Sequence, residues 1–253
     1  YHHNPLPYDP RLTLLPRELL IGARVLDIGC NEGWVSCELA QSWAAQHVVG
    51  VDIDETLVRM AWKRRRAVWS LQAPVDSPRS NPATPSTVLP TSNKRPREAL
   101  PASLSTAPPD PNYFPASCQL MFGQLPILPS DISGDTGTFP HNISFRCADW
   151  VHEVIPEDVE GYDVVLGLSV SKWIHLNGGD SGLRRFFHRV YDALRPGGTF
   201  VFEPQQWDSY TKARKLDPVQ NAKNLKIQPA DFERLLKEIG FVSMKRLGVA
   251  GEG

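Results

Sequence analysis

The chain has 253 residues, a formal net charge of −1 and 41% apolar residues. Near-neutral charge gives no overall positive field toward nucleic acid, so a nucleic-acid partner would have to meet a local patch. Apolar content without a heptad or Gly-X-Y period excludes collagen-like, coiled-coil and wholly disordered classes. No apolar run is long enough to span a membrane and the first residues lack a signal-peptide pattern. We therefore expect a soluble intracellular protein with no membrane partner.

Four cysteines, Cys30, Cys37, Cys118 and Cys147, are spaced too irregularly for a zinc motif or a dense disulfide framework. We expect free thiols and no bound metal.

Short apolar runs alternate with helical patterns along most of the chain. We predict strands at 24–28, 47–52, 142–147, 162–168, 199–204 and 241–247, and helices at 34–43, 54–66, 182–194 and 229–239. This alternation predicts an α/β fold with a doubly wound, mostly parallel sheet. Residues 72–140 hold 14 of the 23 prolines and show no periodicity. We predict a flexible insertion there, inside a single domain that spans residues 1–253.

The first strand-turn-helix is the expected ligand site of such a sheet. Gly29 and Gly33 lie in the turn after Asp27, and Asp52 follows the second strand, where a carboxylate can accept hydrogen bonds from a ribose diol. The G-x-G-x-x-G fingerprint is absent, which favours a nucleoside ligand over a dinucleotide. Packing alone also produces glycine-rich turns. Asp149-Trp150 after the third strand adds an acid for an adenine amino group and a ring to cover the base.

Together these residues resemble the class I S-adenosylmethionine-dependent methyltransferases, and Leu194-Arg195-Pro196-Gly197-Gly198 before a strand is another feature of that family. The segments LGLSVSKWIHLN at 166–177 and FEPQQWDSY at 202–210 are similar to the methylphosphate capping enzymes, the Bicoid-interacting-protein type of RNA methyltransferase. Residues 9–12, residues 29–31 and the long insertion add to the resemblance.

The resemblance implies methyl transfer from S-adenosylmethionine to the 5′-terminal phosphate, typically the γ-phosphate, of a small RNA. Arg11 would bind the methionine carboxylate, and Lys172 would face the phosphate. The implied cofactor contacts are Tyr1, Arg11, Asp27, Gly29, Cys30, Asn31, Gly33, Asp52, Ile53, Asp149, Trp150 and Leu168, and the implied catalytic residues are Lys172, His175 and Asn177. A terminal phosphate carries about −1.5 to −2 charge, so it needs placement and cations rather than a general base.

Simpler interpretations stay open for several of these residues. Trp173 and Trp207 can be packing residues instead of base-stacking platforms, and His175 can be a core or capping histidine. The basic run 63–66 can be a solvated helix end instead of an RNA contact. Lys212, Arg214 and Lys215 follow the site rim in sequence, and we predict that they face RNA.

Two departures from the family pattern concern the ends. The family has an upstream Gly-Asn-Tyr segment, which Tyr1 alone could match, and a final antiparallel strand for which no residues follow 241–247. We expect a shortened chain. The rival functions are a small-molecule or protein methyltransferase and a non-catalytic RNA-binding scaffold of the same fold. We expect a nuclear protein, with cytoplasmic location as an alternative, and protein partners in an RNA-protein complex.

Overall fold

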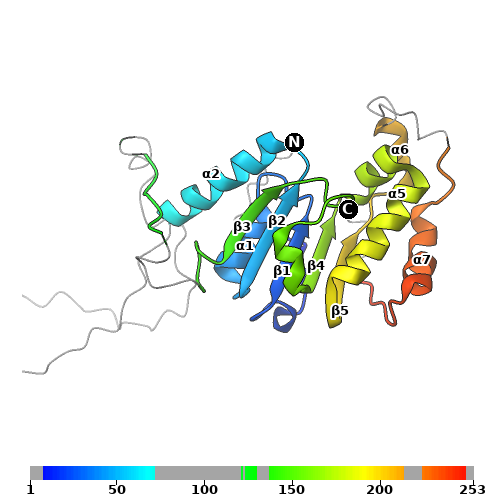
Figure 1. Ribbon diagram of the computed structural model, residues 1–253, viewed down its shortest axis with the longest axis horizontal. Helices are drawn as coiled ribbons and strands as arrows, with labels where there is room; N and C mark the ends of the chain where they lie inside the picture. Colours follow the sequence, from blue (N-terminus) through cyan, green and yellow to red (C-terminus); the bar gives the residue numbers. More distant parts are fainter. Residues whose placement is uncertain (1–7, 72–120, 122, 130–136, 214–223, 249–253) are drawn as a thin grey trace, which may run out of the picture. The chain divides into compact units, whose positions relative to one another are not determined.

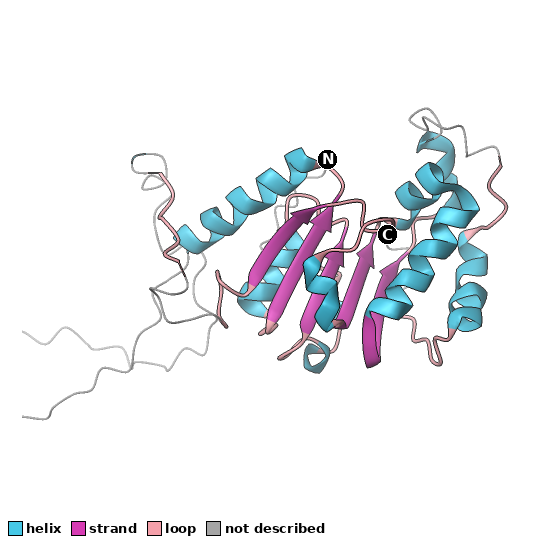
Figure 2. Ribbon diagram, in the orientation of Figure 1, coloured by secondary structure: helices cyan, strands magenta, loops and turns pink. Residues whose placement is uncertain are grey.

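Five parallel strands form one sheet in the computed structural model, which describes residues 8–71, 121, 123–129, 137–213 and 224–248 (Figures 1 and 2). The spatial order is β3-β2-β1-β4-β5. The bounds are β1 (Arg24–Ile28), β2 (His47–Asp52), β3 (Ile143–Cys147), β4 (Tyr162–Leu168) and β5 (Leu194–Glu203). The chain divides into two compact units, residues 1–69 with 125–253 and residues 70–124, and all five strands belong to the first.

Helices cover both faces of the sheet because side chains alternate along each strand. Val25 of β1 packs on one face with α1 and α2, and the next residue, Leu26, packs on the other with α5 and α7. The helices are α1 (Trp34–Ser42), α2 (Glu55–Leu71), α5 (Ser171–Ala193), α6 (Trp207–Ala213) and α7 (Phe232–Ile239), and the short 3-10 turns are η1 (Leu12–Leu14), η2 (Arg17–Leu19), η3 (Pro156–Glu160) and η6 (Pro229–Asp231). This arrangement confirms the predicted doubly wound fold. Within the described residues, no helix is both long and apolar enough to cross a membrane.

Element boundaries differ most from the sequence prediction in three places. The cations at 63–66 do not end α2, which continues to Leu71 because Val68 and Trp69 still pack against the core. Helix α5 starts at Ser171 instead of 182, with Gly179 kinked at a φ of 65°. Strand β5 starts at Leu194 instead of 199.

The strand predicted at 241–247 is wrong. A strand needs a partner for its backbone hydrogen bonds, and none of the described strands pairs with this segment; the Val242 side chain is 98% exposed. Most of residues 72–140 lie outside the described residues, so the insertion stays a prediction. Phe139, near its predicted end, is buried in the core, and the insertion would therefore end before it.

Gly33 is fixed by packing as well as by backbone conformation. Its φ is 74°, and an added Cβ would lie 2.8 Å from the Phe145 ring and 2.9 Å from the Ala61 Cβ. We expect Gly33→Ala to lower the free energy of unfolding by about 2–4 kcal/mol, because steric overlap adds to the left-handed backbone cost.

Gly22 is the matched control for this prediction, measured by urea unfolding. Its φ is 68°, but an added Cβ would meet nothing within 4 Å, so Gly22→Ala should cost about 1 kcal/mol. Equal losses in the two variants would contradict the packing explanation.

Candidate active site

The candidate residues gather at the carboxyl edge of the sheet, the edge at which the strand arrows end in Figure 1. From β1 the chain first adds β2 and β3 on one side of β1. It then crosses over and adds β4 and β5 on the other side, so the direction in which strands are added reverses between β1 and β4. Ligands of open α/β sheets bind at such a reversal, outside the carboxyl ends of the strands. The turn after β1, Asp52 at the end of β2, Asp149 after β3 and Ser169 after β4 all lie at this edge.

The turn after β1 and Asp52 form one hydrogen-bonded unit. Gly29 and Asn31 adopt φ values of 74° and 52°. Asp52 Oδ2 accepts the Asn31 N–H at 2.9 Å, and Oδ1 accepts the Asp54 N–H at 3.0 Å. Each carboxylate oxygen has capacity for a further donor, as the two hydroxyls of a ribose require. Ile53, the next residue, has a 69% exposed side chain, which offers an apolar surface beside that carboxylate.

Asp149 keeps a partly exposed carboxylate at the end of β3. Its Oδ1 accepts the Val151 N–H at 3.2 Å and its Oδ2 lies 2.8 Å from His152 Nδ1. The ring of Trp150 is buried in the core instead, with Nε1 donating to Asp158 at 3.1 Å and the Arg189 guanidinium over the ring. The ring therefore does not cover a base, contrary to the expectation from sequence, and Trp150 can contribute only its backbone to the site.

Asp27 lies beneath the turn, fully enclosed. Its Oδ2 accepts the Ser36 hydroxyl at 2.6 Å. Burial raises the pKa of Asp27 to about 6, against the opposing effects of the Ser36 hydrogen bond and the Arg11 charge. Burial also raises the pKa of the neighbouring Cys30 thiol well above its ordinary value, so Cys30 acts as a small apolar contact.

Arg11 is held by carboxylates on two elements. Its guanidinium makes two hydrogen bonds to Asp9, at 2.9 and 2.7 Å, and one to Glu203 at the end of β5, at 2.8 Å. These partners, led by the hydrogen bonds from Asp9, raise the pKa of Arg11. The arginine implied to bind a methionine carboxylate is therefore already paired with two acids.

Ser169, Glu203 and Gln205 form a network that the sequence did not suggest. Ser169 donates its hydroxyl to Glu203 Oε2 at 2.6 Å, and Gln205 Nε2 donates to the Ser169 carbonyl. Gln205 Oε1 accepts the Ser171 hydroxyl at 3.1 Å and the Lys172 N–H at 3.0 Å. Glu203 is the last residue but one of the predicted strand 199–204 and could have been found by the edge rule. Gln205 carries no such signal.

Lys172 lies in the first turn of α5, with its ammonium 4.9 Å from the centre of the exposed Trp173 ring. Partial burial lowers the pKa of Lys172. The start of α5 also contacts the turn after β1: an added Cβ on Gly29 would lie 2.8 Å from the Val170 side chain. Leu168, at the end of β4, packs partly into the core.

His175 is fully buried, and its ring contacts Asp180 and Tyr210. Its Nε2 lies 2.8 Å from Asp180 Oδ1 and its Nδ1 lies 3.4 Å from the Tyr210 hydroxyl of α6. Asp180 also accepts the backbone N–H groups of Lys226 and Ile227. Burial lowers the pKa of His175 despite the Asp180 contact. The structure thus favours the core interpretation of His175, whereas Asn177 is exposed.

Three of the predicted residues, Tyr1, Arg214 and Lys215, lie outside the described residues, as do the side-chain contacts of Lys212. Trp207 is partly buried against the small cluster around Tyr210, as a packing residue would be.

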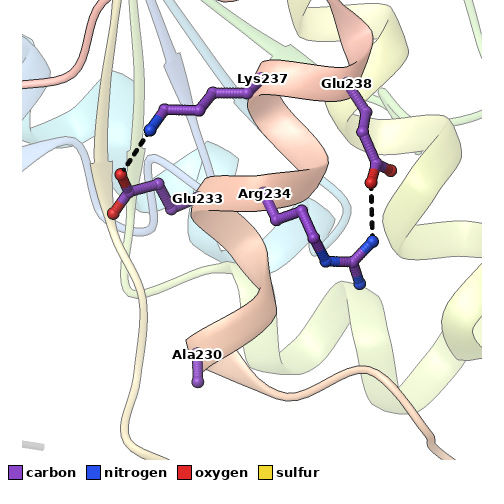
Figure 3. Close-up of a pocket in the computed structure, with 5 residues that line it drawn as sticks. All are labelled: Ala230, Glu233, Arg234, Lys237 and Glu238. Carbon is purple, nitrogen blue, oxygen red and sulfur yellow. Dashed lines mark hydrogen bonds and ion pairs between the residues drawn. The ribbon is translucent and has the colours of Figure 1, made fainter.

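A shallow hollow on the outer surface of α7 is a different feature (Figure 3). Its charges pair with one another, Lys237 with Glu233 at 2.8 Å and Arg234 with Glu238 at 2.7 Å. These are i,i+4 pairs of a solvated helix, and none of the strand-end residues above lines the hollow.

Asp27 should give stability a characteristic pH dependence. Between its ordinary value of 3.8 and about 6, the folded protein binds a proton that the unfolded chain does not. The free energy of unfolding contributed by Asp27 therefore falls as pH rises through this range. Asp27→Asn keeps an acceptor for Ser36 without a titrating group, so its stability relative to the parent should grow between pH 4 and pH 7, by at most about 3 kcal/mol. Urea unfolding at several pH values measures this, and parallel profiles would contradict it.

The buried histidine should matter for stability. We expect His175→Ala to lower the free energy of unfolding by about 2–4 kcal/mol, because it opens a cavity and leaves Asp180 without one partner. His188, an exposed histidine of the same helix, is the control, and His188→Ala should change stability by less than about 0.5 kcal/mol. Thermal unfolding of both variants tests this, and equal effects would argue against the buried network.

Comparison with known proteins shows which family the chain resembles. The family model for Bicoid-interacting protein 3 matches residues 162–253, and a methyltransferase-domain model matches residues 25–81. The chain is 36% identical over 96% of its length to the 7SK snRNA methylphosphate capping enzyme of Homo sapiens, of which it covers 34%. It is 31% identical over 94% of its length to a probable RNA methyltransferase of Arabidopsis thaliana, of which it covers 68%.

A third relative is the U6 snRNA methylphosphate capping enzyme Amus of Drosophila melanogaster. This chain is 29% identical to it over 96% of its own length and covers 63% of the fly protein. The chain therefore spans about a third of the human relative and about two thirds of the plant and fly relatives. Its match to the plant protein extends across both the turn after β1 and the start of α5. The chain belongs to the Bicoid-interacting protein 3 family of methyltransferases.

Proposed function

We propose that this chain methylates the 5′-terminal phosphate of a small RNA, with S-adenosylmethionine as the methyl donor. The human and fly relatives, named as snRNA methylphosphate capping enzymes, support an RNA substrate and this position of methylation.

The observation that carries the proposal is the close packing of Gly29 against Val170. A Cβ added to Gly29 would lie only 2.8 Å from the Val170 side chain. Gly29 belongs to the turn that would hold the nucleoside. Val170 immediately precedes α5, and Lys172 is two residues further on. A cation that can hold a phosphate therefore lies next to the turn suited to the methyl donor.

The residues at this edge suit the donor. Asp52 has acceptor capacity for a ribose diol, Ile53 exposes an apolar surface for a base, and Asp149 has a carboxylate for an adenine amino group. Asp9 and Glu203 surround Arg11, so the neighbourhood is net acidic and complements a positively charged sulfonium. When bound, S-adenosylmethionine supplies an electrophilic methyl group.

The protein residues have a limited task in this reaction. The terminal phosphate oxygen is already a nucleophile, with about −1.5 to −2 charge on the group. Lys172 neutralises part of that charge and orients the phosphate, while Gln205 fixes the backbone of Lys172 through a 3.0 Å hydrogen bond. No described side chain is needed as a general base. A nuclear location and partner proteins in an RNA-protein complex belong to the same proposal.

Transfer of radiolabelled methyl groups to three matched RNAs, with triphosphate, monophosphate or hydroxyl 5′ ends, tests the proposal. We expect label on phosphate-ended RNA only. Transfer independent of the 5′ end, or to none of the RNAs despite cofactor binding, would overturn it.

Lys172→Ala should reduce transfer by at least about 100-fold, since it removes the charge that holds the phosphate, while S-adenosylhomocysteine binding by calorimetry stays unchanged. Lys245→Ala removes an exposed lysine from the segment after α7 and should leave transfer unchanged. Equal activity of the two variants would exclude the role given to Lys172.

A further inference from the structure

The outer face of α2 is cationic in a chain whose overall charge is near zero. After Glu55, this helix carries five Lys or Arg residues and no acid. Arg59, Trp62, Lys63 and Arg66 follow at i, i+3, i+4 and i+7, and all four are exposed. Residues with this spacing share one side of a helix. We call these four residues the α2 face.

One indole of the α2 face and one beside it each have a guanidinium against the ring. Arg64 Cζ lies 3.2 Å from the ring centre of Trp34, the first residue of α1, and Trp34 is 53% exposed. Arg65 Cζ lies 4.6 Å from the ring centre of Trp62, which also meets Phe145 of β3 edge-on at 5.4 Å. Residues 62 and 64 point about 100° to either side of Lys63, so the Trp62 ring and the Trp34 ring under Arg64 lie on opposite sides of Lys63.

Within the described residues, the cations of α2 outnumber the carboxylates that pair with them. Arg59 pairs with Glu55 at 2.7 Å and Arg64 pairs with Glu32 at 3.0 Å. Arg65 and Arg66 donate hydrogen bonds to the backbone carbonyls of residues 143 and 125. A carbonyl does not cancel the charge of the Arg65 guanidinium, so the surface of α2 keeps a local positive potential.

We propose that the α2 face, together with Trp34, binds a single-stranded segment of the substrate RNA downstream of its 5′ end. Cations for phosphates and exposed rings for bases are the combination that single-stranded nucleic acid requires. An anionic membrane would need a broad apolar face, whereas the large apolar side chains that α2 exposes are Met60 and Trp62, set among charges. This inference rests on the proposed function in taking RNA as the substrate.

The position of α2 connects this surface to the candidate active site. The helix starts three residues after the end of β2, beside Asp52, and extends away from the carboxyl edge (Figure 1). Its 17 residues span about 25 Å. An RNA whose 5′ end lies at Lys172 therefore has a second basic surface beside the same edge, on the β2 side of β1.

The double variant Lys63→Gln/Arg66→Gln tests the charge contribution. Affinity is measured by fluorescence polarisation with a single-stranded RNA of about 20 nucleotides that has a 5′ hydroxyl end, because this probe lacks the terminal phosphate. We expect about tenfold weaker binding at low salt, and the slope of log affinity against log salt should decrease in magnitude by about 1.4 for two lost phosphate contacts.

Arg234→Gln/Lys237→Gln is the matched control, since it removes the same charge from the surface of α7 shown in Figure 3. It should leave both the affinity and the salt dependence unchanged. An unchanged affinity in the α2 variant, or an equal loss in the α7 variant, would overturn the proposal.

Methyl transfer separates this inference from the proposed function. For a triphosphate RNA of about 20 nucleotides, the α2 variant should raise KM about tenfold with kcat unchanged, whereas a triphosphate trinucleotide should react as with the parent protein. Absence of transfer to both RNAs by the parent protein would refute the proposed function alone. Equal kinetics of variant and parent on the longer RNA would refute the α2 surface alone.

The ring contribution is tested by Trp34→Ala and Trp34→Phe. Loss of the ring should weaken binding of the hydroxyl-ended RNA about tenfold, and phenylalanine should restore most of it. If both variants bind as the parent does, Trp34 is not part of the surface; thermal unfolding of each confirms that the comparison is between folded proteins.

Discussion

The parallel pairing of β1 with β2 on one side and β4 on the other is the constraint on which the rest of the structure depends. It buries β1 on both faces and directs its alternating side chains into two helix layers. Because all five strands run in one direction, their carboxyl ends meet at one edge. Residues as distant in sequence as Arg11 and Glu203 can therefore share a hydrogen bond there.

Acidic and basic side chains occupy different parts of this fold. Asp9 and Glu203 pair with Arg11, and Asp52 ends β2 at the carboxyl edge of the sheet, whereas the cations of α2 lie along a helix that leads away from it. A net charge of −1 conceals this separation. The field that a ligand meets is set by such local groups, since exposed charges further apart than about 10 Å are largely screened by salt.

The sequence predicts strands and ligand turns better than helix ends and side-chain roles. The strands 24–28 and 162–168 follow from apolar runs, and the edge rule places Asp52 and Asp149 correctly at the carboxyl ends. Periodicity could not reveal that Trp150 is buried, because an indole suits a core and a binding site equally. The pairing of His175 with Asp180 depends on the kink at Gly179, and the Gln205 hydrogen bonds join segments about 35 residues apart. The first is a local contact that a regular helical spacing does not produce, and the second is a tertiary contact without a local pattern.

Ser169 bears on how a substrate would be received at the site. It is one of the few non-glycine residues with a positive φ, 55°, a conformation that is costly unless its surroundings enforce it. Its N–H, hydroxyl and carbonyl are all held, by the Glu203 carbonyl, the Glu203 carboxylate and the Gln205 amide. The backbone leading to Lys172 is thus ordered by the protein itself. If a phosphate binds there as proposed, the conformational entropy of this backbone has already been lost during folding, and binding does not have to order it again.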